Sequence, residues 1–171
     1  MGRNDRFLYI VEGECEKKLI TTFKEQKDII VSGKVQTFNV VQELLTNMHI
    51  RTIKDNTIVI LVFDTDTNNI EIVNENIKFL KKARNIKDVW LVLQVRNLED
   101  ELVRTTNVTQ IKNLIGSKSN KDFKHDFIHE KNLYDKLKCH NFEINKLWIT
   151  SPTGVFKSLK NQGAKVKIVS K

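Results

Sequence analysis

The chain has 171 residues, of which 40% are hydrophobic and 29% are charged. This is an ordinary globular composition, so we expect one domain spanning residues 1–171 rather than a disordered or fibrous chain. No apolar run approaches the ~18 residues that a membrane span requires, which argues against a membrane protein. The two cysteines, Cys15 and Cys139, have no metal-ligand spacing. We therefore expect a reduced protein of the cytoplasm.

The positive charge is concentrated near the C-terminus. The net charge is +8, and no acidic residue follows Glu143. Six lysines do follow it: Lys146, Lys157, Lys160, Lys165, Lys167 and Lys171. Such an excess can neutralise phosphates and favour nucleic-acid binding. A solvated lysine-rich tail that aids solubility is the alternative interpretation.

The N-terminal part alternates strand and helix patterns. The apolar run at residues 7–11 (FLYIV) predicts a strand that ends at Glu12 and Gly13, before a helical pattern begins at Cys15. A short strand is expected over residues 37–41, and helical spacing follows over residues 41–48. These patterns predict a strand, a tight turn, a helix and a second strand in that order.

The strongest strand signal is the apolar, β-branched run TIVILVF at residues 57–63, which is typical of a strand buried on both faces. A helical pattern follows over residues 70–80, and a further buried strand is expected over residues 89–95. The alternation predicts an α/β fold with a Rossmann-like, mostly parallel sheet and helices on both faces.

The C-terminal third, residues 106–171, is read as an extension of the core at residues 7–105. Helical spacing is present over residues 107–115 and 131–137. Strands are expected over residues 147–150 and 164–169, with a helix opened by Pro152 between them. The later segment would then supply an edge strand.

Acidic residues follow three of the predicted strands. Glu12 comes after the first strand, Asp64 and Asp66 after the strand at 57–63, and Glu99 to Glu101 after the strand at 89–95. Ligand sites in open α/β sheets form at the carboxyl ends of the strands. We therefore expect these carboxylates to converge.

The spacing of Asp64 and Asp66 suits a divalent cation. Residues two apart in an extended chain project to the same side, and Mg²⁺ takes one or two carboxylates together with substrate oxygens. Without a cation, clustered carboxylates raise one another's pKa. The alternative for this pair alone is an Asx turn or a helix N-cap.

An EF-hand is the second metal-site interpretation of this region. Asp64, Asp66, Asn68 and Glu75 fall at positions 1, 3, 5 and 12 of such a loop. Position 6 is Asn69 rather than glycine, and a strand pattern precedes the loop where an EF-hand has a helix. These departures count against it.

The run YIVEGECE at residues 9–16 and the run VFDTD at residues 62–66 together resemble the Toprim domain of primases, topoisomerases and OLD-type nucleases. The resemblance covers residues 7–105. It implies Glu12 as the acid or base and Asp64 and Asp66 as ligands of Mg²⁺ or Mn²⁺. The position of Glu12 also makes it a candidate for a further metal ligand. The stretch RNLEDEL at 96–102 looks like the next acidic segment, with Glu99 the best match and Glu101 the alternative.

The resemblance implies a metal-dependent nuclease acting on RNA or DNA, of the kind found as toxin-like effectors of phage defence. A regulatory protein partner or self-association is compatible with that role. As candidates for contact with nucleic-acid phosphates, we single out Lys17, Lys18, Lys118, Lys121, Lys124, Lys157 and Lys160. A topoisomerase or primase would need further domains.

Two other functions are open at this point. The first is a non-catalytic nucleic-acid-binding or assembly module that uses the same acids for recognition or stability. The second is a nucleotide-binding protein of another lineage. Such a protein requires a glycine-rich loop after the first strand to bind phosphate. This chain has a single glycine there, Gly13, between the negatively charged Glu12 and Glu14.

Overall fold

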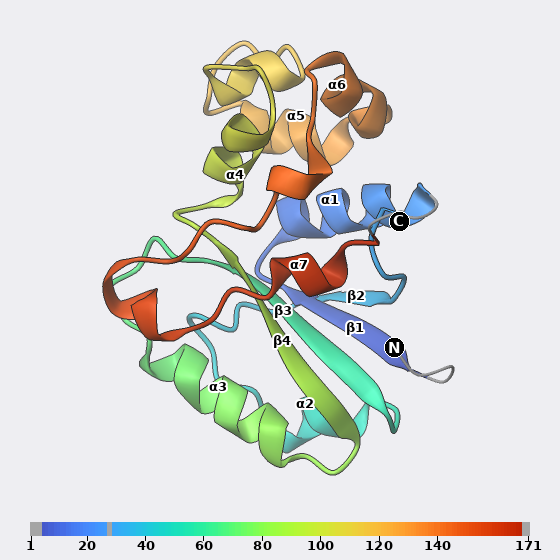
Figure 1. Ribbon diagram of the computed structural model, residues 1–171, viewed down its shortest axis with the longest axis vertical. Coiled ribbons are helices and arrows are strands. Elements are labelled where there is room, and N and C mark those ends of the chain that lie inside the picture. Colours follow the sequence, from blue (N-terminus) through green and yellow to red (C-terminus); the bar gives the residue numbers. More distant parts are fainter. Residues whose placement is uncertain (1–4, 27–28, 169–171) are drawn as a thin grey trace.

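The computed structural model describes residues 5–26 and 29–168. Within those residues, four strands form one parallel sheet in the order β2-β1-β3-β4 (Figure 1). The strands are β1 (Arg6–Val11), β2 (Lys34–Thr37), β3 (Thr57–Asp64) and β4 (Ile86–Gln94). The predicted α/β fold with a Rossmann-like parallel sheet is confirmed.

Helices cover both faces of this sheet, as the strand and helix alternation predicts. On one face lies α1 (Glu14–Glu25), and on the other lie α2 (Asn47–Arg51) and α3 (Glu71–Lys82) (Figure 1). Among the described residues, none of the helices has the length and apolar character needed to cross a bilayer.

Strand β3 connects the two cores because its side chains alternate between the faces. Ile58, Ile60 and Val62 pack in the core under α1. Val59, Leu61 and Phe63 pack in the core under α3. A strand buried on both sides must be apolar at every position, which explains the continuous run seen in the sequence.

The segment after β4 forms a small helical layer that packs beside α1 (Figure 1). Its elements are α4 (Leu98–Thr105), α5 (Phe123–His129) and α6 (Leu133–Cys139), with 3-10 turns at Ile111–Leu114 and Ile144–Lys146. The helix expected over residues 131–137 is close to α6. The helix expected over 107–115 is wrong beyond the single turn at Ile111–Leu114, and α5 was not predicted.

The expected strands of the C-terminal segment are wrong. Residues 147–150 form no strand, and the segment beginning at residue 164 belongs to α7 (Gly163–Val166), preceded by a 3-10 turn at Gly154–Ser158. Only Lys167 forms a single bridge, with Ile30, and Val169 lies outside the described residues.

Side-chain amides satisfy the free edge of β4 in place of a strand. The Asn161 side chain accepts from Leu93 N at 3.2 Å and donates to Leu93 O at 3.0 Å. The Gln162 side chain accepts from Leu91 N at 3.0 Å. Exposed strand edges need such covering, and amides supply it without the alternating apolar pattern of a strand.

The connection from β2 to β3 also differs from the expectation. Strand β2 ends at Thr37, and the expected strand over 37–41 is wrong, as is most of the helix expected over 41–48. The buried Asn76 of α3 fixes this loop: it donates to Val40 O at 2.9 Å and Glu43 O at 2.8 Å, and accepts from Leu45 N at 2.7 Å.

Asn76→Ala should destabilise the protein by about 2–3 kcal/mol, because it leaves buried backbone groups of this loop unpaired. Urea denaturation followed by circular dichroism measures the change. Glu75→Ala, at an exposed position of the same helix, is the matched control and should change stability by less than about 0.5 kcal/mol. Equal effects of the two substitutions would contradict this role for Asn76.

Candidate functional site

An acidic cleft of about 350 Å³ lies at the carboxyl edge of the sheet. Its lining includes Glu12, Glu16, Asn39, Asp64, Glu99 and Lys124. Glu12 follows β1, Asp64 ends β3, and Glu99 lies in the first turn of α4. The predicted convergence of Glu12, Asp64 and Glu99 at one sheet edge is therefore present.

Glu12 is held by a direct link between two strand ends. Strands β1 and β3 pair with Val11 opposite Val62, so the residue after β1 lies beside the end of β3. The Glu12 carboxylate accepts from Asp64 N at 3.0 Å and from the Asn39 side chain at 3.2 Å. Burial raises the Glu12 pKa, and the negative charge of Asp66 adds to this.

Asp64 carries the largest electrostatic perturbation of the site. Its Oδ1 atom is buried and has no hydrogen-bond partner among the described residues. Burial raises the Asp64 pKa from 3.8 to about 9, with further contributions from the charges of Glu16, Glu12, Asp66 and Glu99. Without a cation, this carboxyl group is therefore protonated at neutral pH.

Thr65, between the two aspartates, ties the ends of β3 and β4 together. Its backbone N donates to Gln94 O at 3.1 Å and Arg96 O at 3.0 Å, and its hydroxyl accepts from Arg96 N at 3.0 Å. Arg96 has a positive φ of 68°, so the chain turns sharply here into α4. This turn brings Glu99 to the cleft that contains Asp64.

Asp66 does not belong to the lining of the cleft. It is exposed, yet its charge reaches both Glu12 and Asp64. In this conformation and within the described ranges 5–26 and 29–168, no three His, Cys, Asp or Glu side chains are grouped so that they could hold a metal ion. The Mg²⁺ or Mn²⁺ site therefore stays a prediction.

The structure distinguishes Glu99 from Glu101. Glu99 faces the cleft, where Lys124 Nζ lies 3.3 Å from its carboxylate. Glu101 is fully buried away from it and accepts from Val95 N at 3.0 Å, Trp148 N at 3.1 Å and Arg104 Nη2 at 2.7 Å. Glu101 thus fastens the chain after β4 to the segment near Trp148.

Two further residues of the cleft, Asn39 and Glu16, were not selected from the sequence, whereas Lys124 was a candidate for contact with phosphate. Asn39 lies in the loop that Asn76 fixes. Glu16 follows Glu12 by four residues and is buried, and this burial raises its pKa, assisted by the charge of Glu12. Lys124 comes from α5, and the charge of Glu99 raises its pKa. The spacing of Glu12 and Glu16 was the one available signal.

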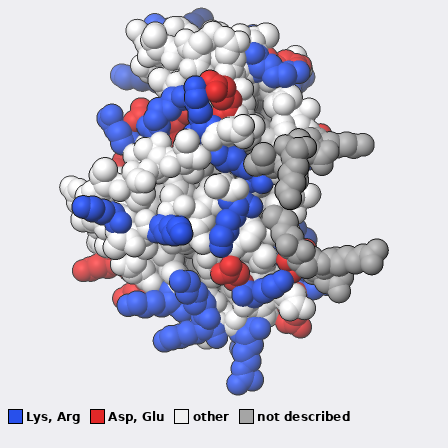
Figure 2. Space-filling view, viewed as in Figure 1, with Lys and Arg blue, Asp and Glu red and all other residues white. Residues whose placement is uncertain are grey.

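Most of the lysines selected from the sequence lie elsewhere. Apart from Lys124, none of them lines the acidic cleft in the described part of the chain, and the following are exposed: Lys17, Lys118, Lys121, Lys157 and Lys160. Lys17 pairs with Glu14 at 3.1 Å. Figure 2 shows basic side chains over much of one face, with acidic side chains among them. Their contact with nucleic acid stays a prediction.

The lysine-rich C-terminal segment is part of the fold as far as residue 168. Lys167 is buried, donates to Asn145 O at 3.1 Å, and has a pKa lowered by burial. Lys165 Nζ lies 5.2 Å from the centre of the Trp90 ring. The segment is therefore folded, with Lys167 buried, whereas Lys146, Lys157, Lys160 and Lys165 are exposed. Lys171 lies outside the described residues.

Comparisons with protein-family models, with curated proteins and with solved structures found no match. The resemblance to Toprim domains accordingly stays a prediction. The functional argument rests on the geometry and charges of the acidic cleft.

Glu101→Ala should lower the free energy of unfolding by about 3 kcal/mol, because it removes the acceptor of the buried Trp148 N–H and the half-buried Val95 N–H and leaves Arg104 without its carboxylate. Denaturant unfolding measures the loss. Asp135→Ala removes a carboxylate that is 69% exposed and pairs with Lys138, and it should cost less than about 1 kcal/mol. A Glu101 variant as stable as this control would be inconsistent with the assigned role.

The raised Asp64 pKa predicts a pH dependence of stability. The folded protein binds more protons than the unfolded chain between pH 3.8 and about 9, so the free energy of unfolding falls as the pH rises through this window. Asp64→Asn removes the carboxyl group that titrates. One pKa unit corresponds to about 1.4 kcal/mol. The free energy of unfolding of wild type should fall between pH 5 and pH 8, and that of Asp64→Asn should fall by at least ~1 kcal/mol less over the same interval.

Urea denaturation in EDTA at the two pH values tests this expectation, with Asp135→Asn as the control that keeps the wild-type slope. The raised pKa values of Glu12 and Glu16 act with the same sign, so a smaller slope remains in the Asp64 variant. An unchanged slope in Asp64→Asn would show that Asp64 does not carry the proton.

Proposed function

We propose that the chain is a divalent-metal-dependent, Toprim-type nuclease that hydrolyses phosphodiester bonds of RNA or DNA. The observation that carries this proposal is the Asp64 carboxyl group, buried at a strand end with an unpartnered oxygen and surrounded by Glu12, Glu16 and Glu99. A buried group with a strongly perturbed pKa in a cleft is a functional-site signature.

The donor set fits a hard divalent cation. The cleft offers carboxylate oxygens, the ligands that Mg²⁺ and Mn²⁺ prefer. Asp64 and Asp66 are the proposed ligands, with Glu12 adjoining them. A bound cation would supply Lewis-acid polarisation of the scissile phosphate. It would also offset the burial of the Asp64 carboxylate and the repulsion from neighbouring carboxylates, which together raise the Asp64 pKa to about 9.

Glu12 is the proposed acid or base. Its carboxylate is oriented by the Asp64 backbone N and the Asn39 side chain, so it keeps a fixed direction in the cleft. Burial raises its pKa, which brings it closer to the operating pH and makes proton acceptance at a carboxylate oxygen more favourable. Its role is to take the proton of the attacking water.

A non-catalytic nucleic-acid-binding module is the second candidate, and one observation favours it. Lys124 pairs with Glu99 at 3.3 Å, so one carboxylate of the cleft is already neutralised by the chain itself. A cleft balanced in this way can be stable without catalysing a reaction.

Purified protein should cleave single-stranded or duplex RNA or DNA in the presence of Mg²⁺ or Mn²⁺ but not in EDTA. Asp64→Asn should reduce the cleavage rate at least ~100-fold, the scale of losing charge stabilisation in an active site. Glu12→Gln should reduce it by about 100-fold or more through loss of proton transfer. Gel assays on labelled substrates measure both rates.

Asp135→Asn, at an exposed carboxylate outside the cleft, is the matched control and should keep the wild-type rate. Titration of Mn²⁺ by electron paramagnetic resonance gives a readout other than activity. Metal binding that Asp64→Asn abolishes, without cleavage of any substrate, would favour the second candidate. Cleavage by Asp64→Asn at the wild-type rate would rule out the catalytic assignment.

A further inference from the structure

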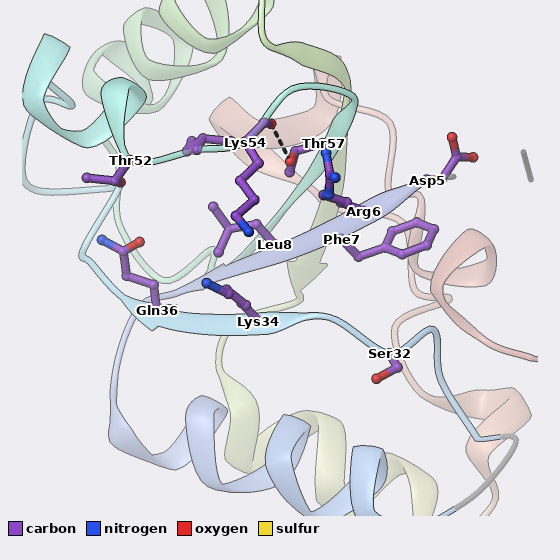
Figure 3. Close-up of a pocket in the computed structure, with 11 residues that line it drawn as sticks. Asp5, Arg6, Phe7, Leu8, Ser32, Lys34, Gln36, Thr52, Lys54 and Thr57 are labelled. Atoms are coloured by element: carbon purple, nitrogen blue, oxygen red, sulfur yellow. Dashed lines mark hydrogen bonds between the residues drawn. The ribbon is translucent and has the colours of Figure 1, made fainter. Parts of the chain in front are cut away.

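A second cavity lies toward the opposite, amino-terminal edge of the sheet, over β1 and β2. Its volume is about 530 Å³, which is larger than that of the acidic cleft and within the ~300–1,000 Å³ range of small-molecule sites. We call it the basic cavity, after Arg6, Lys34 and Lys54 in its lining. Figure 3 shows these side chains around it.

The cationic groups of this cavity lack carboxylate partners. Strand pairing places Lys34 beside Leu8, and in Figure 3 the Lys54 side chain runs past Leu8 toward the strand that carries Lys34. Among the residues that the structure describes, neither lysine forms an ion pair. Lysines that line one cavity repel each other, and a bound anion removes that repulsion.

Arg6 completes the cationic group without being neutralised by the bond it makes. Its Nη1 donates to Asp55 O at 2.7 Å, which fixes the guanidinium but leaves its charge available. The acidic residue of the lining, Asp5, pairs with Lys87. An arginine and two lysines around one space match the several acceptor oxygens of a phosphate group.

The remainder of the lining is apolar or neutral. Leu8 and Ile53 are each 8% exposed, and both contribute to the cavity. Gln36 adds an amide beside them, and Figure 3 shows it at one end of the cavity. A site of this composition recognises a phosphate joined to an apolar or planar group better than a bare anion, because small-molecule sites combine an apolar surface with a few polar anchors.

We propose that the basic cavity binds a nucleoside monophosphate unit, with its phosphate among Arg6, Lys34 and Lys54 and its sugar and base against Leu8 and Ile53. The unit is either a free nucleotide or the 5′-terminal nucleotide of a strand. This site is separate from the acidic cleft at the other edge of the sheet and does not depend on metal or on cleavage.

Isothermal titration calorimetry in EDTA tests the proposal, with AMP, adenosine and inorganic phosphate as probes. AMP should bind at least ten-fold more tightly than either fragment. The double variant Lys34→Gln/Lys54→Gln should weaken AMP binding at least ten-fold, and each single variant should weaken it by a smaller factor. Both lysines are exposed, so these variants should keep the wild-type circular dichroism spectrum.

Lys131→Gln/Lys136→Gln removes the same charge from exposed positions outside the cavity, and it should bind AMP as wild type does. Asp64→Asn should also keep AMP binding, which separates this site from the proposed nuclease centre. Phosphate that binds as tightly as AMP, or equal losses in the two double variants, would overturn the proposal.

A short 5′-phosphorylated oligonucleotide, compared with the same strand lacking the phosphate, identifies the source of the ligand. Tighter binding of the phosphorylated strand than of AMP, lost in the Lys34 and Lys54 double variant, assigns the cavity to strand ends. Tighter binding of AMP assigns it to the free nucleotide. If neither AMP nor the phosphorylated strand binds, the proposal is overturned.

Discussion

The acidic cleft depends on the parallel pairing of β1 with β3. That register sets Val11 beside Val62, so Glu12 follows at the level of Phe63. Its carboxylate accepts a 3.0 Å hydrogen bond from the backbone N–H of the next residue of β3, Asp64. A slip of one residue would turn the carboxylate to the opposite face of the sheet. The packing of two apolar strands thus determines the position of a charged group.

The same pairing brings several carboxylates close together, and the protein's own groups compensate only part of their negative charge. Lys124 offsets Glu99, and hydrogen bonds offset Glu12, but Asp64 Oδ1 receives neither among the described residues. The raised pKa therefore keeps a proton on Asp64 at neutral pH. If the proposed cation binds, it would take the place of that proton, and metal binding and proton release would be one linked equilibrium.

The sequence predicted the features that depend on local pattern. β1, β3 and β4 are continuous apolar runs, and carboxylates at their ends meet because the carboxyl ends of parallel strands share an edge. It did not predict elements whose stability comes from distant partners. Asn76 fixes a loop through three hydrogen bonds, Asn161 and Gln162 replace an edge strand, and α5 is only seven residues long. None of these leaves a periodic signature.

The segments after β4, most of whose structure the sequence pattern did not predict, complete the environment of the cleft. Lys124 comes from α5, and Glu101 joins the turn after β4 to the backbone of Trp148, which supports α4 and hence the position of Glu99. The carboxylates at the strand ends do not depend on this helical layer. Without it, however, Glu99 would lack its ion pair with Lys124 and part of the packing that holds α4 in place. The charge balance at the end of the sheet is therefore a property of residues that follow β4 as much as of the strands themselves.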